Sequence, residues 1–314
     1  MLGNIPATLP VDPDDVLWFG RMLQEKGIDV HAQISPAIKA ARDLGIIMSL
    51  MNCAADKISD KVCVQAVVPA TFDISLATAT ISMIRSLRRV ISLKPELLDS
   101  AWRLIALSSP VSIPQRRTSE RDHIWEILNA AVYSHFGEGV QLNDANAGVD
   151  VRGTFGGTPW GIECKILYAE RNERRIDRIV DGVKQLESDE SVARGVVVVN
   201  ITDCIDHKPF QQSMTDPRSM FRSTEEALAA LKSAVRDFAF KTSTATFQRR
   251  VLGDKHGRPR RKCRAVIFIG QTVALAARRV NVYISQFTTL RSPYEAIDKN
   301  FANRYHDGWR QLQD

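Results

Sequence analysis

The sequence predicts an α/β protein in which a mixed β-sheet, flanked by helices, follows a mainly α-helical N-terminal region. Apolar residues recur at helical spacing through about the first 110 residues, which indicates helices. Four valines at 196–199 follow a charged stretch with helical spacing, and this order is typical of two parallel strands joined by a helix. Two short apolar runs separated by glycines come before the charged stretch and the valines. They predict an antiparallel hairpin, so the sheet should be mixed.

The N-terminal region begins with a helix predicted over 12–27. Asp12 is expected as its N-cap, and Gly27 follows its last apolar residue. Ser35-Pro36 repeats the start signal, and Gly45 is a candidate interruption of that second helix. We expect further helices up to the end of this region.

A stretch rich in proline and serine, SSPVSIPQRRTS at 108–119, then breaks the helical spacing. Such a composition is typical of a boundary between domains. We therefore expect a helical N-terminal domain over 1–112, serving targeting, regulation or oligomer contact, and a second domain over 113–314.

The second domain has a clear order of predicted elements. They are a helix over 119–136, a hairpin over 148–168, a helix over 174–187, a buried strand over 195–201, a helix capped by Ser223 and Glu226, strands over 265–270 and 280–285, and a last helix opened by Ser292-Pro293. We expect the hairpin and the buried strand to belong to one sheet.

Composition narrows the classes of protein. The chain has 314 residues, a net charge of +6 and a pI near 9.1, which favours a polyanionic partner. Its five cysteines are spread widely and form no C-x-x-C pair, so we expect neither a zinc knuckle nor a disulfide framework. The N-terminus has no signal-peptide pattern, and no apolar run approaches the ~20 residues that span a bilayer. We expect a cytoplasmic protein without a membrane partner.

The hairpin carries the residues that packing does not explain. Glu163 and Lys165 alternate with apolar neighbours, and folding the first strand back on the second brings Asp150 beside Glu163. Two adjacent carboxylates repel each other unless a cation lies between them. Asp150, Glu163 and the backbone carbonyl of Cys164 form an all-oxygen set that suits Mg²⁺, with Mn²⁺ as a substitute. Lys165 can hold the attacking hydroxide or stabilise charge on the phosphate, so the expected chemistry is phosphodiester hydrolysis.

At these residues the sequence resembles the PD-(D/E)xK, or restriction-endonuclease-like, nuclease superfamily. Val149-Asp150 and the triplet Glu163, Cys164, Lys165 match its bipartite motif, with Val149 where the name has proline. The resemblance implies a core with helix, strand, strand, strand, helix, strand order over about 119–201. It also implies an acid on the helix before the hairpin, for which Glu126 is better placed than Glu120, as a catalytic and metal-binding residue.

A polar residue on the crossover helix is implied as well, and Gln185, beside Lys184, is the candidate for orienting water or substrate. By contrast, Cys164 should place its side chain in the core, away from the acids. His123 is the histidine nearest the site in sequence, and we interpret it as a surface helix residue.

Two basic segments are candidates for nucleic-acid binding. The first is RRVLGDKHGRPRRKCR at 249–264, in which Arg258, Arg260, Arg261 and Lys262 can contact phosphates. The alternative is a solvated hairpin tip. The second segment starts the crossover helix and contains Arg174 and Arg175, where interspersed acids leave salt-bridged surface as an alternative.

The sequence therefore predicts a Mg²⁺-dependent nuclease, with DNA favoured over RNA and endonuclease over exonuclease activity. The resemblance implies restriction or anti-phage defence, DNA repair or a mobile element as its setting. The alternative is a nuclease-fold module that binds nucleic acid or a protein without cutting. A homodimer, and a partner protein bound through the N-terminal domain, stay open. The sequence has no G-x-x-x-x-G-K-[ST], G-x-S-x-G or H-E-x-x-H motif, so other common enzyme classes lack support.

Overall fold

The sheet has six strands in the order β1-β2-β3-β4-β5-β6. A computed structural model describes residues 13–44, 74–98, 101–143, 148–168, 171–253, 258–277 and 279–313. The strands are β1 (Glu138–Leu142), β2 (Val151–Phe155), β3 (Thr158–Ile166), β4 (Arg194–Asn200), β5 (Cys263–Ala276) and β6 (Arg279–Leu290). β3, β4 and β5 run parallel, and the other neighbours are antiparallel. The predicted mixed sheet is confirmed.

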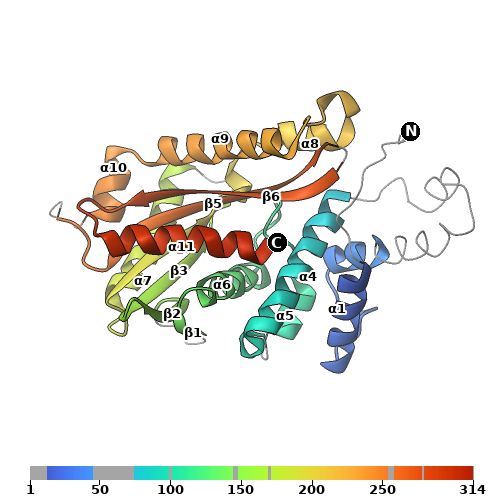
Figure 1. Cartoon of the computed structure of the whole chain (residues 1–314), viewed down its shortest axis with the longest axis horizontal. Coiled ribbons are helices and arrows are strands. Elements are labelled where there is room, and N and C mark those ends of the chain that lie inside the picture. Colours follow the sequence, from blue (N-terminus) through green and yellow to red (C-terminus); the bar gives the residue numbers. More distant parts are fainter. Residues whose placement is uncertain are drawn as a thin grey trace, which may run out of the picture.

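Helices cover both faces of this sheet (Figure 1). One face packs against α4 (Ile74–Leu93), α6 (Ser119–Ser134) and α11 (Ala296–Gln313), with α1 (Pro13–Glu25) and α5 (Trp102–Leu107) behind them. The other face packs against α7 (Asn172–Ser188), α8 (Lys208–Thr215), α9 (Thr224–Thr242) and the single turn α10 (Ala245–Phe247). Short helical turns η1 (Pro95–Leu97), η2 (Thr202–Cys204), η3 (Pro217–Ser219) and η4 (Gln248–Leu252) lie between these elements.

The valine run behaves as predicted because both faces of the sheet are covered. Val196 and Val198 belong to the core beneath α6 and α11, and Val197 and Val199 belong to the core beneath α7 and α9. All four are at most 2% exposed. Such a strand needs no polar alternation.

Local signals locate the start of α9 and the end of α1 as predicted, whereas β5 and β6 extend well beyond the predicted strands. The Ser223 side chain caps α9 by accepting from the Glu226 N–H at 3.2 Å, and Gly27 follows α1 with a φ of +73°, a conformation that favours glycine. The C-terminal helix is a correction: it begins at Ala296, not at Pro293, and the Glu295 N–H donates to the Asp298 carboxylate at 2.9 Å there. Asp12 and Gly45 lie outside the described residues.

The sequence did not predict the strand β1. It has five residues with little apolar alternation, and its pairing with β2 contains a register shift after Glu138. It nevertheless completes a run of helix, strand, strand, strand, helix, strand from α6 to β4.

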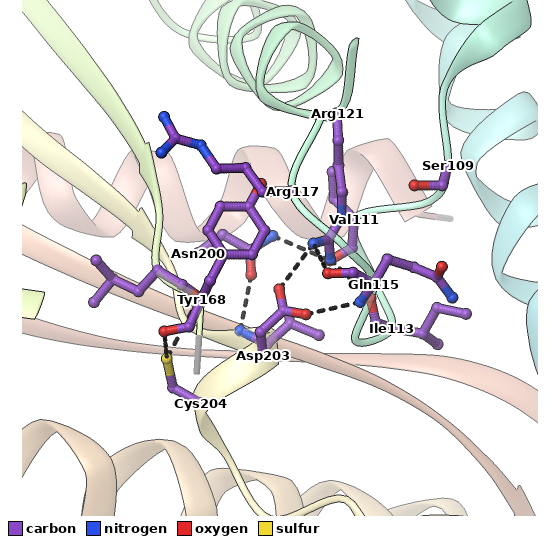
Figure 2. Close-up of polar contacts among 12 residues, drawn as sticks. Ser109, Val111, Ile113, Gln115, Arg117, Arg121, Tyr168, Asn200, Asp203 and Cys204 are labelled. Atoms are coloured by element: carbon purple, nitrogen blue, oxygen red, sulfur yellow. Dashed lines mark hydrogen bonds and ion pairs between the residues drawn. The ribbon is translucent and has the colours of Figure 1, made fainter. Parts of the chain in front are cut away.

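The proline-rich stretch at 108–119 is held firmly in place (Figure 2). The guanidinium of Arg121, which is fully buried, donates to the carbonyls of Pro110, Ile113 and Gln115 and pairs with Asp203 at 2.9 Å. Val111 and Ile113 are buried. Residues on both sides of the predicted boundary therefore share one core, and the division into two domains stays a prediction.

Candidate active site at the β2–β3 hairpin

The hairpin brings the three predicted residues together. Gly156 and Gly157 have positive φ values of 57° and 70°, which a two-residue hairpin turn requires. The register pairs Val151 with Ile162, so one further step places Asp150 opposite Glu163. The Cys164 N–H donates to Asp150 Oδ2 at 2.6 Å.

The helix α7 covers the face of the sheet on which the side chains of Glu163 and Lys165 lie. Lys165 Nζ donates to Glu163 Oε1. A Cβ at Gly182 on α7 would lie 3.0 Å from Glu163 Cγ and 3.2 Å from Lys165 Cε. Glycine at 182 therefore lets the helix approach the site this closely.

Burial changes the protonation of both carboxyls. Burial, with the charge of Glu126, raises the pKa of Asp150 to about 6, although Lys165 and the Cys164 N–H oppose the shift. Burial and the charge of Asp150 raise the pKa of Glu163 to about 8, against the opposing charge of Lys165. Without a cation between the two acids, Glu163 therefore keeps a proton at neutral pH.

Lys165 stays a cation in this environment. Burial lowers its pKa, but the charges of Glu163 and Asp150 outweigh burial, and the net pKa lies above its ordinary value. A lysine with a raised pKa is a poor general base at neutral pH, so its chemistry here is electrostatic.

The donor set fits a hard divalent cation. Glu163 Oε2 is buried without a hydrogen-bond partner in the part of the chain that the structure describes. In an antiparallel ladder the N–H and the C=O of one residue point toward the same neighbouring strand. Because the Cys164 N–H points toward Asp150, the Cys164 carbonyl points in that direction as well. Two carboxylates and a carbonyl are ligands that Mg²⁺ accepts. Within the described ranges no group of three or more His, Cys, Asp or Glu side chains is arranged around a common metal position.

The other predicted catalytic residues lie at different distances from this centre. Glu126 on α6 is close enough for its charge to raise the pKa of both acids, and its carboxylate contacts His123 Nδ1 at 3.1 Å. Gln185 lies one turn beyond Gly182 on α7, and its backbone carbonyl accepts from Ser188 Oγ at 2.9 Å. The roles of Glu126 and Gln185 stay predictions. Cys164 is 7% exposed and packs in the core below α6, as expected.

The basic loop lies away from the acids along the sheet. Gly195 on β4 pairs with both Gly161 on β3 and Cys263 on β5. The loop therefore lies at the amino ends of the parallel strands, level with Gly161, which precedes Lys165 by four residues. Lys262 Nζ donates to the Asp189 carbonyl at 2.6 Å and Arg260 to the Arg250 carbonyl at 2.9 Å.

In the same loop Arg258 and Arg261 are exposed. On α7, Arg174 is exposed, whereas the Arg175 guanidinium lies 5.4 Å from the ring centre of Phe238. Contact of these four residues with nucleic acid stays a prediction.

A second basic group lies at the carboxyl end of β3, and the sequence predicted only part of it. The guanidinium carbons of Arg117, Arg121 and Arg178 lie 6.0, 5.6 and 5.6 Å from the ring centre of Tyr168. Only the arginines at the start of α7 could have indicated this group from the sequence. Arg117 belongs to a segment that resembles a linker, and nothing local marks Tyr168.

No protein-family model, curated protein or solved structure matches this chain. No helix in the described ranges is long and apolar enough to cross a membrane.

Proposed function

We propose that this protein is a Mg²⁺-dependent phosphodiesterase of the PD-(D/E)xK kind that cleaves DNA internally. The observation that carries the proposal is the convergence of Asp150 and Lys165 on the buried Glu163, whose Oε2 has no hydrogen-bond partner among the described residues. Purely structural acids are normally paired or hydrogen-bonded. A cation between them would restore both carboxylates to their charged form.

Each residue has a distinct task in this proposal. Asp150, Glu163 and the Cys164 carbonyl would hold the ion, with Glu126 as an additional acid. Mg²⁺ supplies Lewis-acid chemistry at a phosphate oxygen when it is bound. Lys165 keeps its positive charge next to that position and stabilises the negative charge that develops on the phosphate. The buried surroundings strengthen this interaction because they exclude water.

The order of elements from α6 to β4 supports the same proposal. It is the order that the motif resemblance implies, with Asp150 directly before β2 and Glu163 on β3. A non-cleaving module of the same architecture is the second candidate, because the contact with Lys165 gives Glu163 a partner other than a metal ion.

The test is cleavage of supercoiled plasmid, linear duplex, single-stranded DNA and RNA with Mg²⁺, Mn²⁺ or chelator. We expect wild-type cleavage of DNA with either metal, and loss of it in chelator and in Asp150→Ala and Glu163→Ala. Glu25→Ala, at an exposed position on α1, is the matched control and should cleave normally. Full cleavage in chelator, or by both site variants, would exclude this site, and DNA binding without cleavage would favour the second candidate.

A further inference from the structure

The three arginines around Tyr168 differ in how many of their hydrogen-bond donors already have partners in the protein. Arg121 is fully buried and donates to three carbonyls and to Asp203. Arg117 has a side chain that is 61% exposed and pairs with Asp122 only at 3.7 Å. Arg178 is half-buried on α7, against the ring. Arg121 therefore fixes the local backbone, whereas Arg117 and Arg178 retain guanidinium edges for a ligand.

Tyr168 holds this group in a defined position. Its hydroxyl donates to Asp122 Oδ1 at 3.0 Å, and its carbonyl lies 3.4 Å from the Cys204 thiol. Figure 2 shows Tyr168, Arg117 and Arg121 at the end of β3, beside the segment that Arg121 clamps. The guanidinium groups over the ring gain cation–π attraction, which orders them before any ligand arrives.

The cluster lies one helical turn from the acids along both neighbouring helices. On α6, Asp122 at the ring is four residues before Glu126. On α7, Arg178 at the ring is four residues before Gly182, which contacts Glu163 and Lys165. Four residues of α-helix advance about 6 Å, and adjacent phosphates of one nucleic-acid strand are separated by a comparable distance. A nucleic-acid strand with one phosphate at the acids can therefore place the next phosphate near the ring of Tyr168.

We infer that Arg117 and Arg178, ordered by Tyr168, bind the phosphate adjacent to the one held at Asp150, Glu163 and Lys165. The inference rests on the proposed function and names its substrate class: a polynucleotide strand with consecutive phosphates. Arginine suits this task because its planar fork binds phosphate oxygens in pairs. Asp122 pairs with Arg117 only at 3.7 Å, so a phosphate can replace this long ion pair with shorter contacts, while Asp122 keeps its hydrogen bond from Tyr168.

The test measures binding apart from chemistry. The host is Asp150→Asn in chelator, which lowers the negative charge of the site, and the probe is a fluorescein-labelled single-stranded DNA of 20 nucleotides followed by anisotropy. Arg117→Gln with Arg178→Gln should weaken binding by on the order of tenfold or more. The slope of log K against log salt should become shallower by about 0.7 per lost phosphate contact. Arg21→Gln with Arg103→Gln, two exposed arginines on α1 and α5, removes the same charge and should change neither quantity.

The outcomes separate this inference from the proposed function. Wild-type affinity and slope in the Arg117 and Arg178 variant, an equal loss in the control variant, or no binding by the host would overturn the inference. Arginine-dependent binding by a protein that cleaves nothing would sustain it while refuting the nuclease. Cleavage that is insensitive to both arginines would refute the inference alone.

Discussion

Replacing Glu163 with glutamine is expected to change how the stability of the metal-free protein depends on pH. Burial and the charge of Asp150 raise the pKa of Glu163 from 4.5 to about 8 on folding. A carboxyl with a raised pKa contributes stability below its unfolded pKa, and this contribution is lost as the pH rises through its folded pKa. The free energy of unfolding should therefore fall between pH 4.5 and pH 8.

The size of the effect follows from the shift. Each pKa unit corresponds to about 1.4 kcal/mol, so the full window corresponds to roughly 5 kcal/mol. Glu163 is fully buried, which leaves little solvent screening. Glutamine cannot ionise, so it stays neutral beside Lys165 at every pH in this window. The stability difference between the variant and wild type should therefore rise by roughly 4 kcal/mol between pH 5 and pH 8, whatever its starting value.

The assay is thermal and urea unfolding of both proteins in chelator at pH 5, 6, 7 and 8, with Glu25→Gln as an exposed control. A change of this size corresponds to a relative Tm shift of roughly 8 °C. Mg²⁺ should raise the stability of the wild type at pH 8 by about 2.7 kcal/mol at a hundredfold excess over Kd, and should act less on the variant. Parallel pH profiles for the variant and wild type would refute the reasoning, because they would mean that Glu163 is already ionised in the folded chain.

Three further predictions follow. Lys165→Ala should lower turnover by a factor on the order of 10² or more with little change in metal affinity, and loss of metal binding in calorimetry would show that the lysine holds the site together. Burial raises the pKa of Asp189, but hydrogen bonds from Ser191 and the Val149 N–H, with Arg152 nearby, outweigh burial and lower it to about 2. Asp189→Asn should therefore cost roughly 2 kcal/mol at pH 7, a difference that disappears as the pH falls from about 4 to 2; equal urea midpoints at pH 7 would contradict this. Neutralising Arg258 and Arg261 should make the salt slope for duplex DNA shallower by about 0.9 per phosphate contact, and an unchanged slope would identify the loop as solvated surface.

The residues of the hairpin show how far local sequence reaches. Strand alternation has a period of two, so Glu163 and Lys165 had to share a face opposite Cys164, and the paired glycines at 156 and 157 had to turn the chain. The buried strand at 196–199 was equally determined, because four consecutive valines fit only a sheet covered on both faces. These features depend on neighbours in sequence, and the structure reproduces them.

Other features depend on contacts between distant segments, and only the tertiary structure decided them. The stretch at 108–119 has the composition of a linker, yet it is ordered by Arg121 and Asp203, which are 82 residues apart. The raised pKa values of the two acids depend on how completely α7 and the sheet remove them from water, which no spacing in the sequence reports. Tyr168 and Arg178 meet only because β3 and α7 pack side by side. Backbone periodicity is local and can be predicted, whereas burial and side-chain convergence are properties of the whole packed chain.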